Sequence, residues 1–274
     1  MATFQFRDKK IFYRDEGEGN PVILVHGFAE DGNVWNKQLK YLKENFRVIV
    51  PDLPGSGATE FVENVISIED YADVLKALAE EVILKKENSS NNFCMIGHSM
   101  GGYITLAFAE KYPEVLNSFG LFHSSAYSDS DEKIAMRRKG IQFIRKNRTE
   151  PFVKTSVPNL FSEETKREKP QMIRELIEIA KSISPEALIN YYKAMIDRPD
   201  RTSVLKSFRK PVLLIAGKLD TAVPLNLSLE QFSMPSISHV HILQHSGHMG
   251  MWEEKELSNT FLHNFLKDVK ISEL

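Results

Sequence analysis

Four short, almost uninterrupted apolar runs constrain the fold of this chain more than any other feature of its sequence. They are Val22–Val25, Val48–Val50, Phe93–Ile96 and Phe119–Phe122, and segments long enough for a helix separate each run from the next. Runs without polar alternation suit strands covered on both faces, which is how parallel sheets are buried. The pattern therefore predicts an α/β protein with a mostly parallel central sheet and helices on both faces.

Further strands are expected at both ends of the chain. Phe4, Phe6, Ile11 and Tyr13 alternate with polar residues, which predicts two half-buried strands joined at residues 8–9. Near the other end, Val212–Ile215 and Val240–Leu243 are predicted to be two more strands of the central sheet. Apolar residues at helical spacing then predict a final helix from Leu257 to Val269.

Further segments inside the chain are predicted to be helical. Residues 67–82 carry apolar side chains at helical spacing behind a capping-box pair, Ser67 and Asp70. Between residues 124 and 200 the strand signal disappears, and three separate helical stripes take its place. We therefore expect one core, made of residues 1–123 and 201–274, with residues 124–200 inserted as a helical cap over the strand ends, where ligands of α/β folds bind.

The composition of the chain limits the kinds of molecule that it is expected to bind. Of the 274 residues, 42% are hydrophobic and 26% are charged, as in ordinary globular domains. The formal net charge of -2 favours neither nucleic acid nor an anionic membrane as a partner. The single cysteine, Cys94, excludes an internal disulfide and favours a reducing compartment. With no secretory signal and no apolar run near the ~18 residues of a membrane span, we expect a cytoplasmic protein that acts on a small molecule.

The segment Gly97-His98-Ser99-Met100-Gly101 marks a candidate nucleophile. It places a serine between two glycines where the run Phe93–Ile96 meets a helical segment. A strand that turns directly into a helix strains the turning residue and leaves its hydroxyl exposed at the end of the strand. We therefore predict that Ser99 is a nucleophile, and that His98 beside it is a packing residue.

A serine nucleophile needs a base and a carboxylate that orients the base. Asp220 follows the strand Val212–Ile215, and His248 follows the strand Val240–Leu243, so both are expected at the same sheet edge as Ser99. A surface turn is the alternative role for Asp220, and His245 is the alternative base. No set of histidines and carboxylates has metal-ligand spacing, and no phosphate-binding glycine loop is present, so neither a metal nor a cofactor is expected.

These residues, together with His26-Gly27-Phe28 and the segment Pro51–Gly57, resemble the α/β-hydrolase superfamily over essentially the whole chain. The resemblance implies the α/β-hydrolase fold with a helical cap, and a triad in which Ser99 attacks, His248 is the base and Asp220 orients it. It also implies an oxyanion hole made of the backbone amides of Phe28 and Met100.

The function expected from this resemblance is a serine hydrolase that cleaves a small carboxylic ester through an acyl-enzyme. The alternatives are a carbon–carbon bond hydrolase or lyase of the same fold, and a small-molecule receptor with an intact triad. The residues expected to line the substrate pocket are His123, Tyr127, Phe143 and Met249. The basic stretch from Arg137 to Arg148 is interpreted as a solvated helix face, with attraction of an anionic substrate as the alternative. The sequence leaves the natural substrate and the oligomeric state open.

Overall fold

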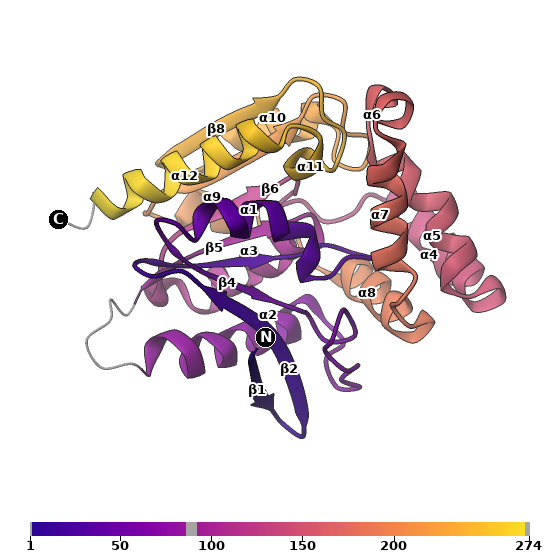
Figure 1. Cartoon of the computed structure of the whole chain (residues 1–274), viewed down its shortest axis with the longest axis horizontal. Helices are drawn as coiled ribbons and strands as arrows, with labels where there is room; N and C mark the ends of the chain where they lie inside the picture. The colour runs from indigo at the N-terminus through magenta and orange to yellow at the C-terminus, as the bar shows by residue number, and fades with distance from the viewer. Residues whose placement is uncertain (1, 86–91, 272–274) are drawn as a thin grey trace.

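The computed structural model describes residues 2–85 and 92–271, in which eight strands form one sheet with helices on both faces (Figure 1). The strands lie in the order β1-β2-β4-β3-β5-β6-β7-β8. They are β1 (Ala2–Phe6), β2 (Lys9–Glu16), β3 (Pro21–Val25), β4 (Arg47–Pro51), β5 (Phe93–His98), β6 (Leu116–Phe122), β7 (Val212–Gly217) and β8 (Ser238–Leu243). The pairs β1–β2 and β2–β4 are antiparallel, and every other neighbouring pair is parallel. The predicted mostly parallel sheet is confirmed.

Burial along the strands follows their place in the sheet. The inner strands β3, β5 and β7 are buried at every residue, as expected for strands covered by helices on both faces. Strand β8 is the outermost strand on its side, and most of its residues are partly or fully exposed. Its apolar run is correspondingly shorter and is interrupted by histidine.

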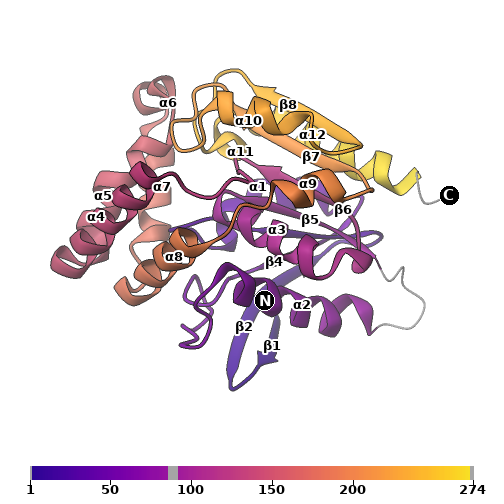
Figure 2. The ribbon, with the colours of Figure 1, turned by 180° about the vertical axis from the view of Figure 1, so that it is seen from behind.

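The helices around the sheet form two layers (Figures 1 and 2). On one face, α1 (Asn36–Leu42), α11 (Gly250–Glu253) and α12 (Lys255–Ile271) pack together, whereas α2 (Ile68–Ala79), α3 (Met100–Lys111) and α9 (Thr202–Ser207) pack together on the other. Helix α10 (Leu225–Phe232) packs against β7. Three short helical turns also lie outside residues 124–200 in the described part of the chain. They are the 3-10 turns η1 (Gly32–Trp35) and η3 (Pro113–Val115) and the π-helical turn η2 (Glu80–Leu84). The predicted capping box of Ser67 and Asp70 starts α2, which ends three residues short of Val82 and continues as η2.

Residues 124–200 form helices that lie together beyond one end of the sheet (Figure 1). They are α4 (Asp131–Asn147), α5 (Thr149–Ser156), η4 (Val157–Leu160), α6 (Glu163–Glu168), α7 (Pro170–Ala180) and α8 (Pro185–Asp197). Serine side chains cap α4, α6 and α8, and proline occupies the first turn of α7 and α8. Among the helices of residues 2–85 and 92–271, none combines the length and the apolar character needed to cross a membrane.

Candidate active site

Ser99 occupies the sharp turn between β5 and α3. Its φ of 51° and ψ of -116° lie outside the regions that most non-glycine residues adopt. Its N–H donates to the carbonyl of Phe122 on β6 at 3.0 Å, and its side chain does not cap α3. The glycines allow strand and helix to approach, because a Cβ at Gly97 would lie 2.1 Å from the carbonyl oxygen of Gly101. The backbone therefore holds the Ser99 side chain at the end of the strand without using its hydroxyl as a helix cap.

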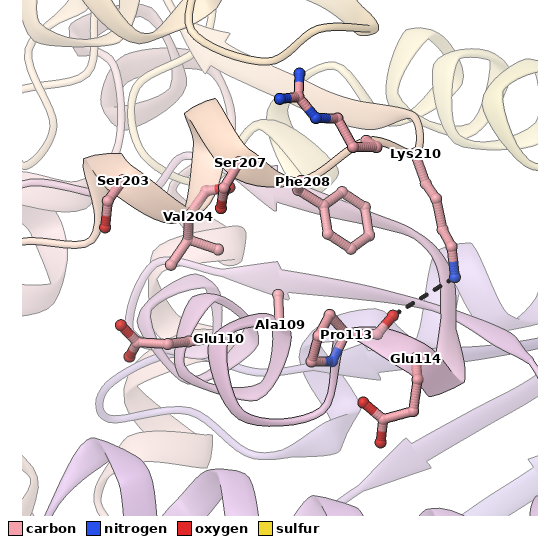
Figure 3. Close-up of a pocket in the computed structure, with 10 residues that line it drawn as sticks. Ala109, Glu110, Pro113, Glu114, Ser203, Val204, Ser207, Phe208 and Lys210 are labelled. Atoms are coloured by element: carbon pink, nitrogen blue, oxygen red, sulfur yellow. Dashed lines mark hydrogen bonds between the residues drawn. The ribbon is translucent and has the colours of Figure 1, made fainter.

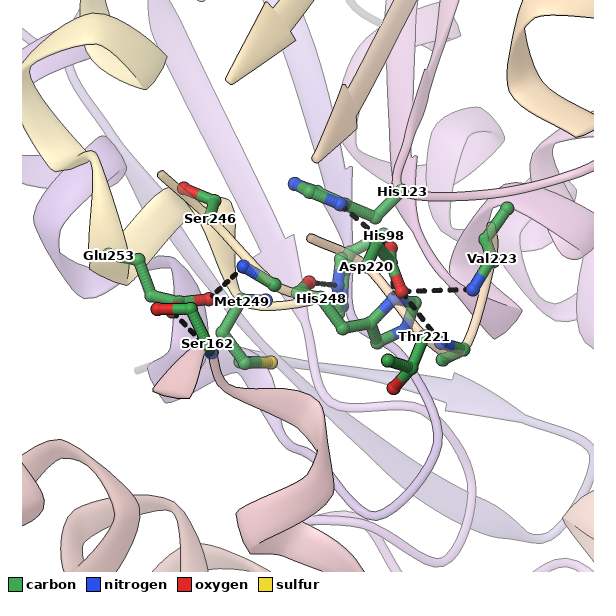
Figure 4. A network of polar contacts seen from close by, with 12 residues as sticks. His98, His123, Ser162, Asp220, Thr221, Val223, Ser246, His248, Met249 and Glu253 are labelled. Carbon is green, nitrogen blue, oxygen red and sulfur yellow. Dashed lines mark hydrogen bonds and ion pairs between the residues drawn. The ribbon is translucent and has the colours of Figure 1, made fainter. Parts of the chain in front are cut away.

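Asp220 follows β7, and its carboxylate accepts four N–H groups (Figure 4). Oδ2 accepts from Nδ1 of His248 at 2.8 Å and from Nδ1 of His123 at 3.0 Å. Oδ1 accepts from the backbone N–H groups of Ala222 at 2.8 Å and Val223 at 2.9 Å. Burial alone would raise the pKa of Asp220, but the charge interaction with His248 and the imidazole hydrogen bonds outweigh it and hold the pKa well below the usual range. Asp220 is thus an ionised carboxylate in a fixed orientation.

His248 is held by its loop as well as by this carboxylate. Its backbone N–H donates to the carbonyl of Leu160 at 2.7 Å. Glu253 accepts the N–H groups of both neighbours, Gly247 at 2.9 Å and Met249 at 3.3 Å (Figure 4). Because Nδ1 of His248 faces an ionised carboxylate, this nitrogen carries the proton and Nε2 is left to accept one. This tautomer is the one a general base requires.

His123 stands at the end of β6 and is a second imidazole on Asp220. It is buried and has a φ of 50°, and Nδ1 donates to Asp220. Its Nε2 has no hydrogen-bond partner among the described residues. Burial, the largest contribution, lowers the pKa of His123 to about 4, so the ring is neutral. The structure therefore places His123 on the same carboxylate oxygen as His248, where its hydrogen bond restrains Asp220.

This geometry predicts different effects for two substitutions of His123. Asparagine can place an amide N–H where the imidazole Nδ1–H lies and tolerates positive φ, whereas phenylalanine removes the donor. We expect His123→Asn to retain kcat within a few-fold and His123→Phe to lower it about tenfold or more, as for a lost hydrogen bond to a charged group. Steady-state kinetics on an ester test this, with the exposed His245→Asn as the control. Equal kcat values for the two His123 variants would contradict the orienting role.

The predicted oxyanion donors come from two neighbouring segments. Met100 begins α3, so its N–H is among those that the helix leaves without an internal acceptor. Phe28 follows Gly27, where an added Cβ would lie 3.1 Å from the Cβ of Ser99. His26 fixes the same loop, because its Nε2 accepts the N–H of Leu53 at 3.0 Å. The structure thus brings the loop that carries Phe28 beside the nucleophile.

Aromatic rings from the inserted helices surround Phe28. Its ring stacks on Tyr192 with centroids 4.3 Å apart, and it meets Phe152 at 6.2 Å and Tyr191 at 6.4 Å. Phe143, one of the predicted pocket residues, meets the outer side of this cluster through Phe152 at 6.4 Å and is itself 39% exposed. These contacts form an apolar wall next to the proposed oxyanion hole.

Two other predicted pocket residues make different contacts. Met249 is fully buried in the His248 loop. The hydroxyl of Tyr127 donates to Glu230 at 3.0 Å, on the solvent side of the protein. Both residues lie in loops, where local sequence patterns do not define the direction of a side chain.

The basic stretch of α4 departs from expectation at one residue. Arg138, Lys139, Arg145, Lys146 and Arg148 are exposed, as expected for a solvated face. Arg137 is buried instead, and its Nε donates to Asp129 at 2.5 Å. Arg198 donates to the other oxygen of the same carboxylate at 3.0 Å. The interpretation of Arg137 as solvated is therefore wrong, because a buried carboxylate outside the helix pairs with it.

Three potential metal ligands meet within the described residues. The nearest ligand atoms of His123, Asp220 and His248 all lie within 4.8 Å of one another. In this arrangement each imidazole donates Nδ1–H to the carboxylate, so a cation would have to displace both protons. We therefore interpret the group as a hydrogen-bonded network.

A surface hollow of about 490 Å³ lies away from this network, between α3 and α9 (Figure 3). Glu110, Phe208 and Lys210 are among its lining residues. Lys210 Nζ reaches the carbonyl of Pro113 at 3.5 Å (Figure 3). None of the predicted site residues lines this hollow.

Comparison with known proteins agrees with the fold. Residues 20–255 match the family model described as alpha/beta hydrolase fold. The chain belongs to the α/β-hydrolase fold family. A solved thermophilic esterase from Thermogutta terrifontis, with malate bound, is 30% identical with a TM-score of 0.90, and 97% of each chain is covered.

Curated proteins named as hydrolases are also similar to this chain. A 2-hydroxy-6-oxononadienedioate/2-hydroxy-6-oxononatrienedioate hydrolase from Paraburkholderia phymatum is 25% identical, over 94% of this chain and 91% of that protein. A 2-hydroxy-6-oxo-6-phenylhexa-2,4-dienoate hydrolase from Comamonas testosteroni is 24% identical, over 95% and 92%. The names of these relatives support the interpretation of this chain as a hydrolase.

Proposed function

We propose that this α/β hydrolase cleaves a small carboxylic ester through an acyl-enzyme on Ser99. The observation that carries the proposal is the 2.8 Å hydrogen bond from His248 to Asp220, at the same sheet edge as the strained turn of Ser99. The three residues occur in the chain order Ser, Asp, His and each follows a parallel strand. The likeness to the thermophilic esterase adds support for an ester.

The proposed mechanism follows from the proton positions. Nε2 of His248 takes the proton of the Ser99 hydroxyl as Oγ attacks the ester carbonyl, and Asp220 stabilises the imidazolium. The amides of Phe28 and Met100 donate to the oxyanion of the tetrahedral intermediate. His248 then protonates the departing alcohol, leaving an acyl-enzyme. A water molecule, deprotonated by His248, attacks the acyl carbon and releases the acid and Ser99.

We further propose that residues 124–200 act as a cap that completes the site. The backbone carbonyl of Leu160 accepts the N–H of His248, and the N–H of Ser162 donates to Glu253 at 2.8 Å. The inserted helices thus contact the loop that carries the base. They also supply the rings around Phe28, which favours an apolar group in the substrate.

A carbon–carbon bond hydrolase is the second candidate, because the curated relatives named above cleave oxo-dienoates according to their names. A panel of p-nitrophenyl esters beside a 2-hydroxy-6-oxo-dienoate separates the two. We expect kcat/KM at least about tenfold higher for the best ester, which corresponds to a difference of about 1.4 kcal/mol in transition-state stabilisation. A higher kcat/KM for the dienoate would replace the ester proposal with carbon–carbon hydrolysis, and absence of multiple turnovers on both would contradict hydrolysis of either class.

A further inference from the structure

We infer that His98 and Glu30 form a buried imidazolium–carboxylate pair that positions the nucleophile, the oxyanion loop and the base loop against one another. We refer to these two residues as the clamp. The inference rests on the proposed function where it concerns catalysis, whereas the charge state of the pair is independent of it.

Both ring nitrogens of His98 face oxygen atoms. Nε2 lies 2.9 Å from the backbone carbonyl oxygen of His248, and Nδ1 lies 3.0 Å from a carboxylate oxygen of Glu30. A carbonyl oxygen only accepts hydrogen bonds, so Nε2 carries a proton. An ionised Glu30 likewise requires a proton on Nδ1. With both nitrogens donating, His98 is an imidazolium.

The hydrogen bonds of Glu30 and the charge of His98 keep the Glu30 carboxylate ionised. Its side chain is 2% exposed, and Oε2 also accepts the N–H of Gly27 at 2.6 Å. Burial opposes the charge on each partner, but their mutual interaction outweighs it, so the pKa of Glu30 is lowered and the pKa of His98 is raised. A buried carboxylate with two N–H donors and an opposite charge is fully paired.

The clamp joins three catalytic segments. His98 directly precedes Ser99, Gly27 precedes Phe28, and the carbonyl of His248 belongs to the proposed base itself. A Cβ at Gly27 would lie 3.0 Å from both Glu30 Oε2 and His98 Nδ1, so a larger residue there would have to displace the paired groups by a few tenths of an ångström. His98 and Glu30 are therefore positioning residues that act through the groups they hold.

The surroundings of His98 place other ionisable groups near the ring. The ring centroids of His248 and His123 lie 4.9 Å and 6.1 Å away, and Asp220 contributes favourably by its charge. Trp35 and Phe122 contact the same ring edge-on. Because both side chains are buried, the attraction between their opposite charges is stronger than it would be in water. Close pairing of the two ions is therefore favoured over their separation.

Nitrogen-15 NMR of the side-chain imidazoles tests the charge state in the unmodified protein. We expect both nitrogens of His98 to show imidazolium shifts at about pH 7, above the ordinary histidine pKa of about 6.5. His98→Asn assigns the signal by removing it. In Glu30→Gln the imidazolium signature should be lost by about pH 7, whereas the exposed Glu18→Gln should leave it unchanged. A neutral His98 at about pH 7 with Glu30 intact would overturn the pair.

Two isosteric substitutions test positioning. In His98→Asn the amide keeps a donor at the position of Nδ1 but loses the hydrogen bond to the carbonyl of His248. In His98→Gln the amide keeps a donor at the position of Nε2 but loses the hydrogen bond to Glu30. Each should lower kcat about tenfold to a hundredfold on the best ester with KM within a few-fold, and His245→Asn should change neither. Wild-type kcat in both His98 variants would overturn the positioning role. If the wild-type protein turned over no ester, the proposed function would fail, while the NMR result would still decide the pair.

Discussion

Replacing Ser99 with alanine should abolish ester turnover while leaving the fold intact. The substitution removes only the hydroxyl, and alanine keeps the Cβ that serine already holds at the strained φ of 51°. Removal of the nucleophile from a triad of this kind typically lowers kcat about 10⁶-fold, because the three residues act as a unit. Hydrolysis of a p-nitrophenyl ester by purified protein measures the loss.

The matched control is Ser203→Ala, in the hollow between α3 and α9. It removes an exposed hydroxyl from the other end of the core and should leave kcat unchanged. Unfolding curves should agree between the wild-type protein and both variants. Turnover by Ser99→Ala within tenfold of wild type would remove Ser99 from the mechanism.

Asp220→Asn should lower kcat by about 10⁴-fold, as the corresponding change does in serine proteases. The carboxylate accepts four N–H groups, and an amide oxygen cannot accept all of them. If the amide N–H₂ faces His248, the imidazole carries its proton on Nε2 and can no longer take one from serine. Asp8→Asn, an exposed aspartate, is the control and should keep full activity.

The same substitution should change stability in a pH-dependent way. The pKa of Asp220 is lower in the folded protein than the ordinary value of about 3.9, so the ionised carboxylate stabilises the fold above that pH. This contribution is lost as the pH falls further, through the folded pKa. The wild-type advantage in unfolding free energy over Asp220→Asn should therefore shrink below about pH 4. An advantage that grows on acidification would contradict the assigned charge state.

Much of the core follows from local patterns in the sequence. The runs Val22–Val25, Val48–Val50, Phe93–Ile96 and Phe119–Phe122 all lie in strands of the sheet, because continuous burial on both faces demands apolar residues at every position. The capping pair of Ser67 and Asp70 marks the start of α2 correctly. The end of α2 was harder to predict, because the apolar spacing continues through the π-helical turn η2.

The inserted helices show where local patterns fail. The sequence predicts three helical stripes between residues 124 and 200, whereas the structure also contains α5 and α6, which have eight and six residues. Helices this short present too few turns for a periodic stripe. A serine caps α6, but no side chain caps α5. The rotation of each helix depends on its packing, so the rings around Phe28 could be only partly anticipated.

The roles of the residues that support the site also depend on tertiary contacts. The sequence predicts that His123 lines the substrate pocket, and the structure shows its Nδ1 in contact with Asp220, 97 positions away in the chain. Glu253 and Glu30 carry no motif signal. Glu253 accepts backbone N–H groups from Gly247 and Ser162, whereas Glu30 accepts the N–H of Gly27 in its own loop and pairs with His98. Their buried carboxylates become informative only when the partners are known.

Covalent labelling with a fluorophosphonate, followed by peptide mapping, tests the central claim most directly. The account predicts one label per chain, on Ser99, with ester turnover lost in proportion to labelling and labelling slowed strongly in His248→Ala. A stoichiometric label on another residue, or full turnover after complete labelling of Ser99, would contradict it.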